Sequence, residues 1–266
     1  MKKTSSLIFP AAVALALANT AWADITGNVT LVSDYAFRGI SQTWERPAIQ
    51  GGFDYTHASG FYLGTWASNV SGNTYPNANM EWDFYGGYNG KINDDLSYNV
   101  GLLQYYYPGG KTSAVSPNDK FDTLEAYAGI TWKWLNLKYS HTLTDYFGIS
   151  NSGFQPCNFS TGVCDAPNGN SKGSGYLEAN VTYEIMDKLN LIAHIGHQKV
   201  RHYKNLDYTD WKIGITKELP KEWGGLILGA AYVDTDADKD YFRFAANGET
   251  KTLSDSRFII SVGKTF

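Results

Sequence analysis

The sequence has little charge and no excess of basic residues. Lys, Arg, Asp and Glu make up 18% of its 266 residues, with 22 basic against 26 acidic side chains. A nucleic-acid-binding protein is expected to carry a basic patch or stripe, so this balance argues against that class of function. Aromatic residues make up 15% of the chain, which argues against a disordered protein.

Beyond the N-terminal segment, the chain lacks any long hydrophobic run. No segment there approaches the roughly 18 uncharged apolar residues that a transmembrane helix needs. Proline is scarce at 8 residues, whereas 27 Gly, 19 Tyr, 13 Phe and 8 Trp are present. Many glycines and aromatic residues with few charges are typical of a β-rich chain whose strands are apolar on one face and polar on the other.

The first residues predict a secretory signal peptide. Lys2 and Lys3 precede an apolar segment over 7–18, and residues 21–23 (Ala-Trp-Ala) form a small-x-small cleavage site. The apolar segment is too short to span a membrane as a helix, so cleavage after Ala23 is favoured over an uncleaved anchor. The sequence therefore predicts a signal peptide over 1–23 and a mature domain over 24–266 that leaves the cytoplasm.

Twelve runs of about ten residues show the period-two alternation of β-strands, and helix signals are nearly absent. Over residues 177–185, for example, every odd position is apolar and every even position is polar. A helix would scatter these two sets around its circumference, whereas a strand separates them. We expect strands over 25–35, 47–57, 61–70, 80–92, 96–107, 122–134, 135–147, 174–185, 189–200, 208–219, 225–235 and 255–266.

The connections between these runs alternate in length. Five are short turns, and most of the other six are longer, the longest being 148–173. Short turns at one end, longer loops at the other and an even number of strands are typical of an outer-membrane barrel. Lipid offers backbone groups no partners, so such a sheet must close without a free edge. The sequence predicts an all-β fold, a transmembrane antiparallel up-and-down β-barrel of about 12 strands in a bacterial outer membrane. We expect its lumen to be narrow and partly occluded.

Aromatic residues gather near the ends of the expected strands. The sequence predicts that Tyr105 to Tyr107, Tyr146-Phe147, Trp132, Trp134 and Trp223 belong to the two interfacial aromatic girdles of a membrane barrel. The last expected strand ends with Phe266 as the terminal residue. A C-terminal aromatic residue on such a strand resembles the sorting signal of bacterial outer-membrane proteins.

A motif near the N-terminus carries a family resemblance. The segments are VSDYAFRGISQT, residues 32–43, and PAIQGG, residues 47–52. They resemble the opening motif of the TorF-like porin family, also called Gcw_chp, and the strand pattern is similar over essentially the whole mature chain. The resemblance implies an outer-membrane, porin-like role and brings no established substrate and no catalytic residues.

Within this motif, Asp34 and Arg38 are expected to pair at the end of the first strand. Gly39 fits a turn that needs a positive φ. We favour a structural role for this loop over a role in binding a permeant.

The polar faces of the strands direct charged side chains toward the predicted lumen. The acidic set is Asp34, Asp54, Glu81, Asp83, Glu125, Glu178, Glu184, Asp210 and Glu218, and the basic set is Lys91, Lys133, Lys138, Lys212 and Arg257. An excess of acids in a confined pore attracts cations, so one hypothesis is a mild cation preference. The other is that these charges pair across strands and stabilise a filled interior. Inward glycines such as Gly101 and Gly196 either leave open space or make room for large side chains such as Tyr127.

Cysteine and histidine do not predict a metal site. Six residues separate Cys157 from Cys164 in the longest loop. In a secreted chain, such a pair is expected to form a disulfide. His194, His197 and His202 are close in sequence, but His194 and His197 point to opposite faces of a strand.

Enzymatic chemistry is not predicted either. The neighbouring residues Ser140 and His141 would face opposite sides of the sheet, and the Gly-x-Ser-x-Gly motif of a nucleophile elbow is absent. We therefore expect a cofactor-free channel for passive diffusion of small hydrophilic solutes, with outer-membrane lipids and the barrel-assembly machinery as partners. The alternatives are a non-conducting structural or surface ligand-binding barrel and, less favoured, an outer-membrane lipid hydrolase. No oligomeric state is predicted.

Overall fold

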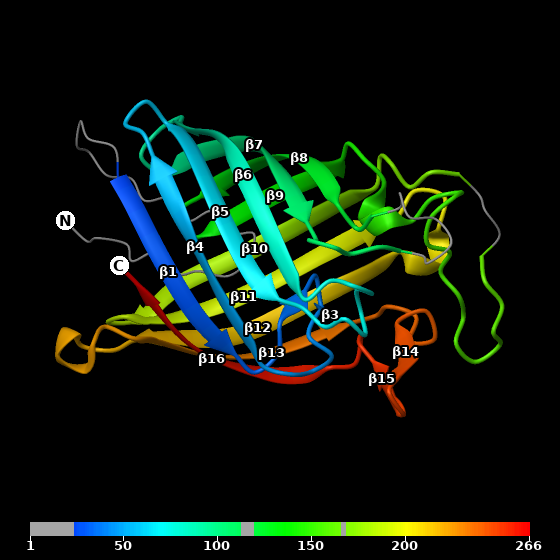
Figure 1. Ribbon diagram of the computed structural model, residues 1–266. Coiled ribbons are helices and arrows are strands. Elements are labelled where there is room, and N and C mark those ends of the chain that lie inside the picture. The colour runs from blue at the N-terminus through cyan, green and yellow to red at the C-terminus, as the bar shows by residue number, and fades with distance from the viewer. Residues whose placement is uncertain (1–23, 113–119, 166–168) are drawn as a thin grey trace.

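Twelve antiparallel strands close into a barrel in the computed structural model, which describes residues 24–112, 120–165 and 169–266 (Figure 1). The longer loops lie at the right-hand end of the barrel in Figure 1, and the short turns lie at the left-hand end together with the start of β1 and the end of β16. We call these the long-loop end and the short-turn end. The predicted signal peptide, residues 1–23, lies outside the described residues.

Each barrel strand pairs with its neighbour in chain order, and β16 returns to β1. The barrel strands are β1 (Asp24–Val32), β4 (Ala48–Thr56), β5 (Phe61–Asn69), β6 (Met80–Lys91), β7 (Leu96–Tyr106), β8 (Thr123–Trp132), β9 (Leu135–Thr142), β10 (Gly175–Met186), β11 (Leu189–Lys199), β12 (Tyr208–Glu218), β13 (Ile227–Thr235) and β16 (Arg257–Thr265). The predicted all-β fold and its strand count are confirmed.

Two short hairpins and three 3₁₀ turns are not part of the barrel wall. The hairpins pair β2 (Ala36–Phe37) with β3 (Ile40–Ser41), and β14 (Arg243–Ala246) with β15 (Glu249–Thr252). The 3₁₀ turns are η1 (Tyr146–Gly148), η2 (Lys204–Leu206) and η3 (Lys221–Trp223). Over the described residues, no helix has the length and apolar character needed to cross a membrane.

The barrel is apolar outside and polar inside. On β10, Leu177 is 58% exposed on the outer face, whereas its neighbours Tyr176 and Glu178 are 2% and 8% exposed inside the barrel. The same alternation places Ile195 and Ile213 on the outer surface. Since side chains alternate across a sheet, the period-two pattern of the sequence becomes a sorting of apolar from polar residues between the two faces.

Antiparallel pairing of β1 with β16 closes the barrel. Asn28 lies opposite Thr265, and Gly27 exchanges backbone hydrogen bonds of 2.8 and 2.9 Å with the terminal Phe266. The Phe266 ring lies against Gly27, where an added Cβ would come within 2.7 Å of it. The terminal residue therefore takes part in the last contact that leaves the sheet without an edge.

The predicted girdle residues divide between the two faces. Trp132, Trp134 and Trp223 are exposed on the outside, at 49%, 42% and 69%. The prediction is wrong for Tyr105 and Tyr107, each 2% exposed, and for Tyr146 and Phe147, each 9% exposed. Tyr105 and Tyr107 have inward parity on β7. The other two follow β9, which ends at Thr142 instead of running to residue 147, and they pack inside.

Inward glycines make room for tyrosine rings. A Cβ added to Gly101 would lie 2.5 Å from the Tyr127 hydroxyl, and one added to Gly196 would lie 2.0 Å from the Tyr176 hydroxyl. Both distances are too short for non-bonded atoms, so each glycine allows a ring from the adjacent strand to lie across it. Of the two alternatives for these positions, the structure shows the second.

Gly196→Ala is expected to lower the free energy of unfolding by about 1–3 kcal/mol, because Tyr176 is hydrogen-bonded and has no free space to move into. The measurement is urea unfolding of the refolded barrel in lipid vesicles. Gly72→Ala is the control, because its Cβ would meet its nearest neighbour at 3.6 Å. Equal stabilities for the two variants would contradict this explanation of the glycines.

Candidate functional site

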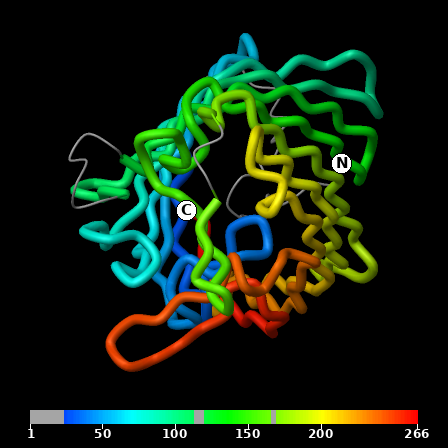
Figure 2. The backbone as a smooth tube through the Cα atoms, turned by 90° about the vertical axis from the view of Figure 1, so that its right-hand side faces the viewer, coloured from blue at the N-terminus to red at the C-terminus, as the bar shows by residue number. Residues whose placement is uncertain are grey.

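The segment that follows β1 folds into the barrel. Its hairpin β2–β3 turns through Arg38 and Gly39, which have φ values of 47° and 81°. Positive φ at both central residues defines a type I′ turn, the tight connection that suits the twist of paired strands. Figure 2, seen from the long-loop end, shows this blue segment within the ring of strands.

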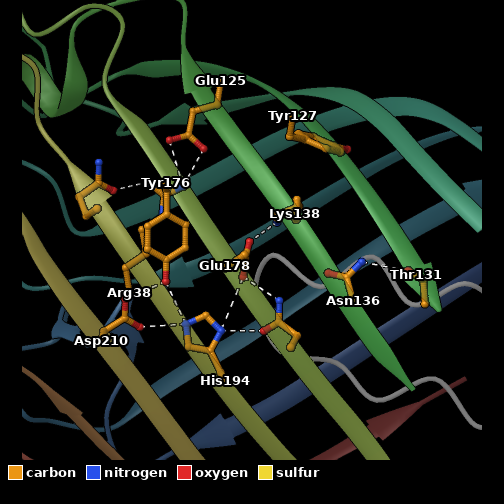
Figure 3. Close-up of polar contacts among 12 residues, drawn as sticks. Arg38, Glu125, Tyr127, Thr131, Asn136, Lys138, Tyr176, Glu178, His194 and Asp210 are labelled. Atoms are coloured by element: carbon orange, nitrogen blue, oxygen red, sulfur yellow. Dashed lines mark hydrogen bonds and ion pairs between the residues drawn. The ribbon is translucent and has the colours of Figure 1, made fainter. Parts of the chain in front are cut away.

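The tip of the hairpin reaches the far wall of the barrel. A Cβ on Gly39 would lie 2.8 Å from the Asp210 Cβ on β12 and 3.3 Å from the Thr235 Cβ on β13. The Arg38 guanidinium donates to both carboxylate oxygens of Glu125 on β8, at 2.8 and 3.0 Å, and to Gln198 on β11 at 2.8 Å. It also lies over the Tyr176 ring, 4.2 Å from the centroid. One side chain therefore connects three strands (Figure 3).

The Arg38–Glu125 ion pair is almost fully buried, with side-chain exposures of 7% and 2%. Burial by itself lowers the pKa of the Arg38 guanidinium, but the Glu125 carboxylate beside it outweighs this effect, so the pKa lies well above its usual value. Two charges removed from water in this way are stable only together, because either one alone would keep its desolvation cost without the attraction.

The predicted pairing of Asp34 with Arg38 is wrong. Asp34 instead accepts hydrogen bonds from Arg257 at 2.8 Å and from the hydroxyls of Ser41 and Thr43 at 2.7 Å each. The hairpin carries Arg38 across the lumen and away from the end of β1, so the two cannot meet. The sequence did point to Gly39, but it did not identify Arg38 as a lumen residue, because the fifteen-residue link between β1 and β4 was treated as a surface loop.

Aromatic side chains pack around the hairpin and close the long-loop end. Phe37 packs edge-to-face on Tyr105 and on Phe147, with centroids 5.5 and 5.7 Å apart. The hydroxyls of Tyr35 and Tyr107 donate to Glu81 at 2.8 and 2.7 Å. Burial, and next the negative charges of Glu81 and Asp83, hold the Tyr35 pKa well above its usual value, so this hydroxyl stays a donor.

The inward side chains of β8 and β10 become more exposed toward the short-turn end. Along the inner face of β8, Thr123, Glu125 and Tyr127 are buried, whereas Gly129 and Thr131 are partly exposed. Along β10, Tyr176 and Glu178 are buried, whereas Thr182 and Glu184 are exposed. The structure therefore has a stopper at the long-loop end, made by the hairpin and the rings around it, and a polar vestibule beside β8 and β10 toward the other end. On the opposite side, Tyr62 on β5 and Asn99 on β7 stay buried.

A connected polar cluster lies on the wall below the stopper (Figure 3). Glu178 pairs with Lys138 at 2.8 Å and accepts a hydrogen bond of 2.9 Å from Asn180. His194 contacts the Asn180 amide oxygen at 2.7 Å and Asp210 at 2.9 Å. In this arrangement both ring nitrogens of His194 face oxygen atoms. The cluster joins β9, β10, β11 and β12 by side-chain contacts in addition to the backbone ladder.

The predicted lumen residues divide into an inner group and a rim group. Those facing the interior are Asp34, Asp54, Glu81, Asp83, Glu125, Lys138, Glu178, Asp210, Lys212 and Arg257. The rim residues lie at the short-turn end. Of these, Lys91 pairs with Asp94, Lys133 with Asp95, and Glu218 with Lys188, at 2.7, 3.4 and 2.7 Å, and Glu184 is exposed. Lys133 belongs to a turn with φ of 53°, so it does not follow the strand parity from which it was assigned to the lumen.

Within the described residues, three inward carboxylates form no ion pair. Asp54 accepts a 2.6 Å hydrogen bond from Tyr85, Glu81 accepts from its two tyrosines, and the Oδ1 atom of Asp83 has no hydrogen-bond partner. All three lie on β4 and β6, which form one side of the barrel with β5 between them. This side of the lumen therefore carries three carboxyl groups that have no cation beside them.

Other candidate residues do not form a reactive site. Cys157 and Cys164 are joined by a disulfide. Ser140 is buried inside the barrel and His141 is exposed outside it, so they do not form a nucleophile–base pair. In the part of the chain that the structure describes, no group of three or more His, Cys, Asp or Glu residues is arranged to hold a metal ion.

Comparisons with known proteins agree with the barrel. A family model described as "Bacterial protein of unknown function (Gcw_chp)" matches residues 17–266, in agreement with the resemblance of residues 32–52 to that family, although the name TorF is not part of this match. The fold is similar to "KdgM porin in complex with disordered oligogalacturonate", with a TM-score of 0.51 and 9% identity over 92% of this chain and 99% of that chain. It is also similar to "NanC porin structure in rhombohedral crystal form", with a TM-score of 0.52 and 11% identity over 91% of this chain and 98% of that chain. No curated protein matches the sequence.

The Lys138–Glu178 pair is expected to be strongly coupled. Lys138→Met should lower the free energy of unfolding by about 3 kcal/mol, because it leaves Glu178 buried without its cation. In a double-mutant cycle with Glu178→Gln, the coupling energy should be about 2–3 kcal/mol. The exposed pair Lys91–Asp94 is the control, and its cycle should give a coupling too small to resolve. Similar coupling in both cycles would contradict the burial argument.

Proposed function

Since the chain belongs to Gcw_chp, a family of bacterial proteins of unknown function, and has a polar lumen, we propose that it is an outer-membrane, porin-like channel. It conducts small hydrophilic solutes by passive diffusion, without a cofactor, and the hairpin β2–β3 controls passage. The observation that carries this proposal is the interior. A closed barrel with an apolar outer surface holds a polar vestibule that ends at the infolded hairpin β2–β3 and not at a continuous apolar core.

The hairpin can leave the lumen without breaking the barrel wall. Its strands pair only with each other, and the wall ladder runs from β1 directly to β4. The Arg38 contact with Glu125 and Gln198 holds its tip, and its base is held by Phe37 on the surrounding rings and by the Ser41 amide, which donates to the Leu253 carbonyl at 2.9 Å. Loss of these contacts would uncover the wall residues behind the hairpin, and water could then replace it in the lumen.

The lumen chemistry favours small polar solutes with a mild preference for cations. The vestibule carries Asn136, Thr131 and Thr182 on its inner face. Near the stopper, the ion-paired charges cancel, and Asp54, Glu81 and Asp83 remain as carboxyl groups without a cation, which become a source of negative charge once water reaches them. Charged side chains in a confined pore set its selectivity through their field, so this imbalance favours cations.

The termini support a role in membrane assembly as well. Phe266 pairs with Gly27 at the closure of the barrel, and its ring is 65% exposed on the outer surface. We propose that it is the sorting signal read by the barrel-assembly machinery before closure, and that membrane lipids cover the apolar outer surface afterwards.

Arg38→Ala should open the channel. The variant leaves Glu125 without its cation in the closed state, so the equilibrium should shift toward the open state by about a hundredfold or more. Single-channel conductance in planar bilayers measures the fraction of time spent open. Lys138→Ala is the matched control, because it removes a buried lumen cation whose carboxylate partner, Glu178, belongs to the barrel wall.

Two results would argue against a hairpin-controlled pore. One is a folded Arg38→Ala barrel that stays silent at all voltages, which would favour the non-conducting alternative. The other is equal opening by Lys138→Ala, which would show that any lumen charge has this effect. If Arg38→Ala does not fold, Glu125→Gln tests the same contact while preserving the shape of the side chain.

Cation preference should decrease when the unpaired carboxylates are neutralised. In the Arg38→Ala background, we expect a reversal potential in a potassium chloride gradient that favours potassium. The double substitution Asp54→Asn and Asp83→Asn should move this reversal potential toward zero, because the lumen loses two carboxylates that have no cation beside them. Glu222→Gln, in the exposed turn η3, should leave it unchanged. A reversal potential that favours chloride would contradict the selectivity proposal.

A further inference from the structure

A hollow of about 960 Å³ lies on the outer side of the barrel, where β9, β10 and β11 reach the long-loop end. Tyr139, Leu177 and His197 line it, and all three have outward parity on their strands. Leu177 and Tyr139 are 58% and 47% exposed. The hollow is therefore separate from the lumen and faces the medium that surrounds the barrel.

The register of the strands arranges the surface around the hollow in rows. The row nearest the loops is His141, Gly175 and Lys199, and the next row is Tyr139, Leu177 and His197. The third row is Leu137, Ala179 and Ile195. The surface thus changes from cationic to apolar over three rows, in the direction from the loops toward the middle of the barrel.

Gly175, at the centre of the first row, has no side chain to fill the surface there. A Cβ at this position would lie 2.5 Å from the Tyr139 hydroxyl and 3.0 Å from its ring. The Tyr139 ring therefore lies across the position that a larger residue on β10 would fill. The absence of a side chain at Gly175 therefore helps to form the hollow beside Lys199.

The cations beside the hollow differ from those of other loops. Lys199, Arg201 and Lys204 are exposed, and no ion pair joins them to a carboxylate within residues 24–112, 120–165 and 169–266. In the loops between β1 and β4 and between β13 and β16, by contrast, cations are paired, as Arg46 with Glu249, Lys239 with Asp255, and Lys251 with Glu45, at 3.1, 2.6 and 2.6 Å.

The carboxylates in the lining already have donors. Asp207 accepts a 2.6 Å hydrogen bond from the Val200 amide, and Asp165 accepts from Asn205 and Tyr241 at 3.0 and 2.9 Å. Both therefore face the loop structure, and three basic side chains against two carboxylates leave the lining with an excess of positive charge. An anion would complement this charge.

We propose that this hollow binds the phosphorylated headgroup of a membrane lipid in the leaflet at the long-loop end. Lys199, Arg201 and Lys204 contact the phosphate, and an acyl chain lies along Leu177, Leu137 and Ile195. Basic side chains directly above an apolar surface match the order of charge and hydrocarbon in a lipid. The apolar rows favour a lipid over a soluble anion, which would gain nothing from them. The proposal rests on the membrane location in the proposed function and is independent of conduction.

The test is native mass spectrometry of the refolded full barrel in detergent micelles, with added dioleoyl phosphatidic acid. We expect the wild type to retain bound phosphatidic acid and to prefer it over dioleoyl phosphatidylcholine, whose headgroup has no net charge. The combined variant Lys199→Gln, Arg201→Gln and Lys204→Gln should bind it about tenfold to a hundredfold more weakly. Circular dichroism verifies that the variant is folded.

The control variant is Arg46→Gln, Lys239→Gln and Lys251→Gln, which removes the same charge from loops where the cations are paired. It should bind phosphatidic acid as the wild type does. An equal loss in the control would overturn the proposal in favour of general attraction to a positive surface. Displacement of the lipid by equimolar glycerol phosphate would show a site for free phosphate and would also overturn it. Because binding is measured without a voltage or a gradient, a silent channel would not affect the result.

Discussion

Closure of the sheet is the constraint on which the rest of this structure depends. A barrel whose outer face is apolar has no water or second sheet to satisfy an edge strand, so β1 must meet β16. The contact between Gly27 and Phe266 completes that pairing. Once the sheet is closed, alternate side chains must point inward, and the apolar ones are needed outside. The interior therefore contains the polar side chains of every strand, whether or not each of them finds a hydrogen-bond or ion-pair partner there.

The polar groups of the interior are stabilised by charge pairing, and the space between them is filled mainly at the long-loop end. Four inward carboxylates face cationic or imidazole partners, with Asp34 on Arg257, Glu125 on Arg38, Glu178 on Lys138 and Asp210 on His194. Tyrosine rings that lie over glycines fill the space between them. Toward the short-turn end, the inward residues of β8 and β10 are partly or fully exposed. Water can satisfy polar groups on that side of the lumen, so it needs less filling.

The wall could be predicted from the sequence because it depends on local rules. Alternation, turn length and strand count follow from residues that are close in the chain, and each predicted strand overlaps an observed one. The stopper depends on contacts over long sequence separations, such as Arg38 with Glu125 and with Gln198, and no periodicity encodes them. Tyr105 and Tyr107 illustrate the difference. Their parity on β7 already pointed inward, but their clustering at a strand end suggested a girdle, and only the infolded hairpin explains why aromatic rings are needed inside. The same holds for Lys133, because a turn residue with positive φ no longer follows the parity of its strand.

The tip of the hairpin indicates that its position in the lumen matters more than the stability of the turn. A two-residue type I′ turn is best served by Asn-Gly, because both central residues need positive φ and asparagine tolerates it. Here the first position is Arg38 with φ of 47°, a conformation that costs an ordinary side chain about 1 kcal/mol. Arginine at this position therefore weakens the isolated hairpin. It also supplies the planar group that binds both Glu125 oxygens and lies over Tyr176. The residue at the tip therefore favours the contacts that the hairpin makes across the lumen over the stability that a better turn residue would give to the hairpin alone.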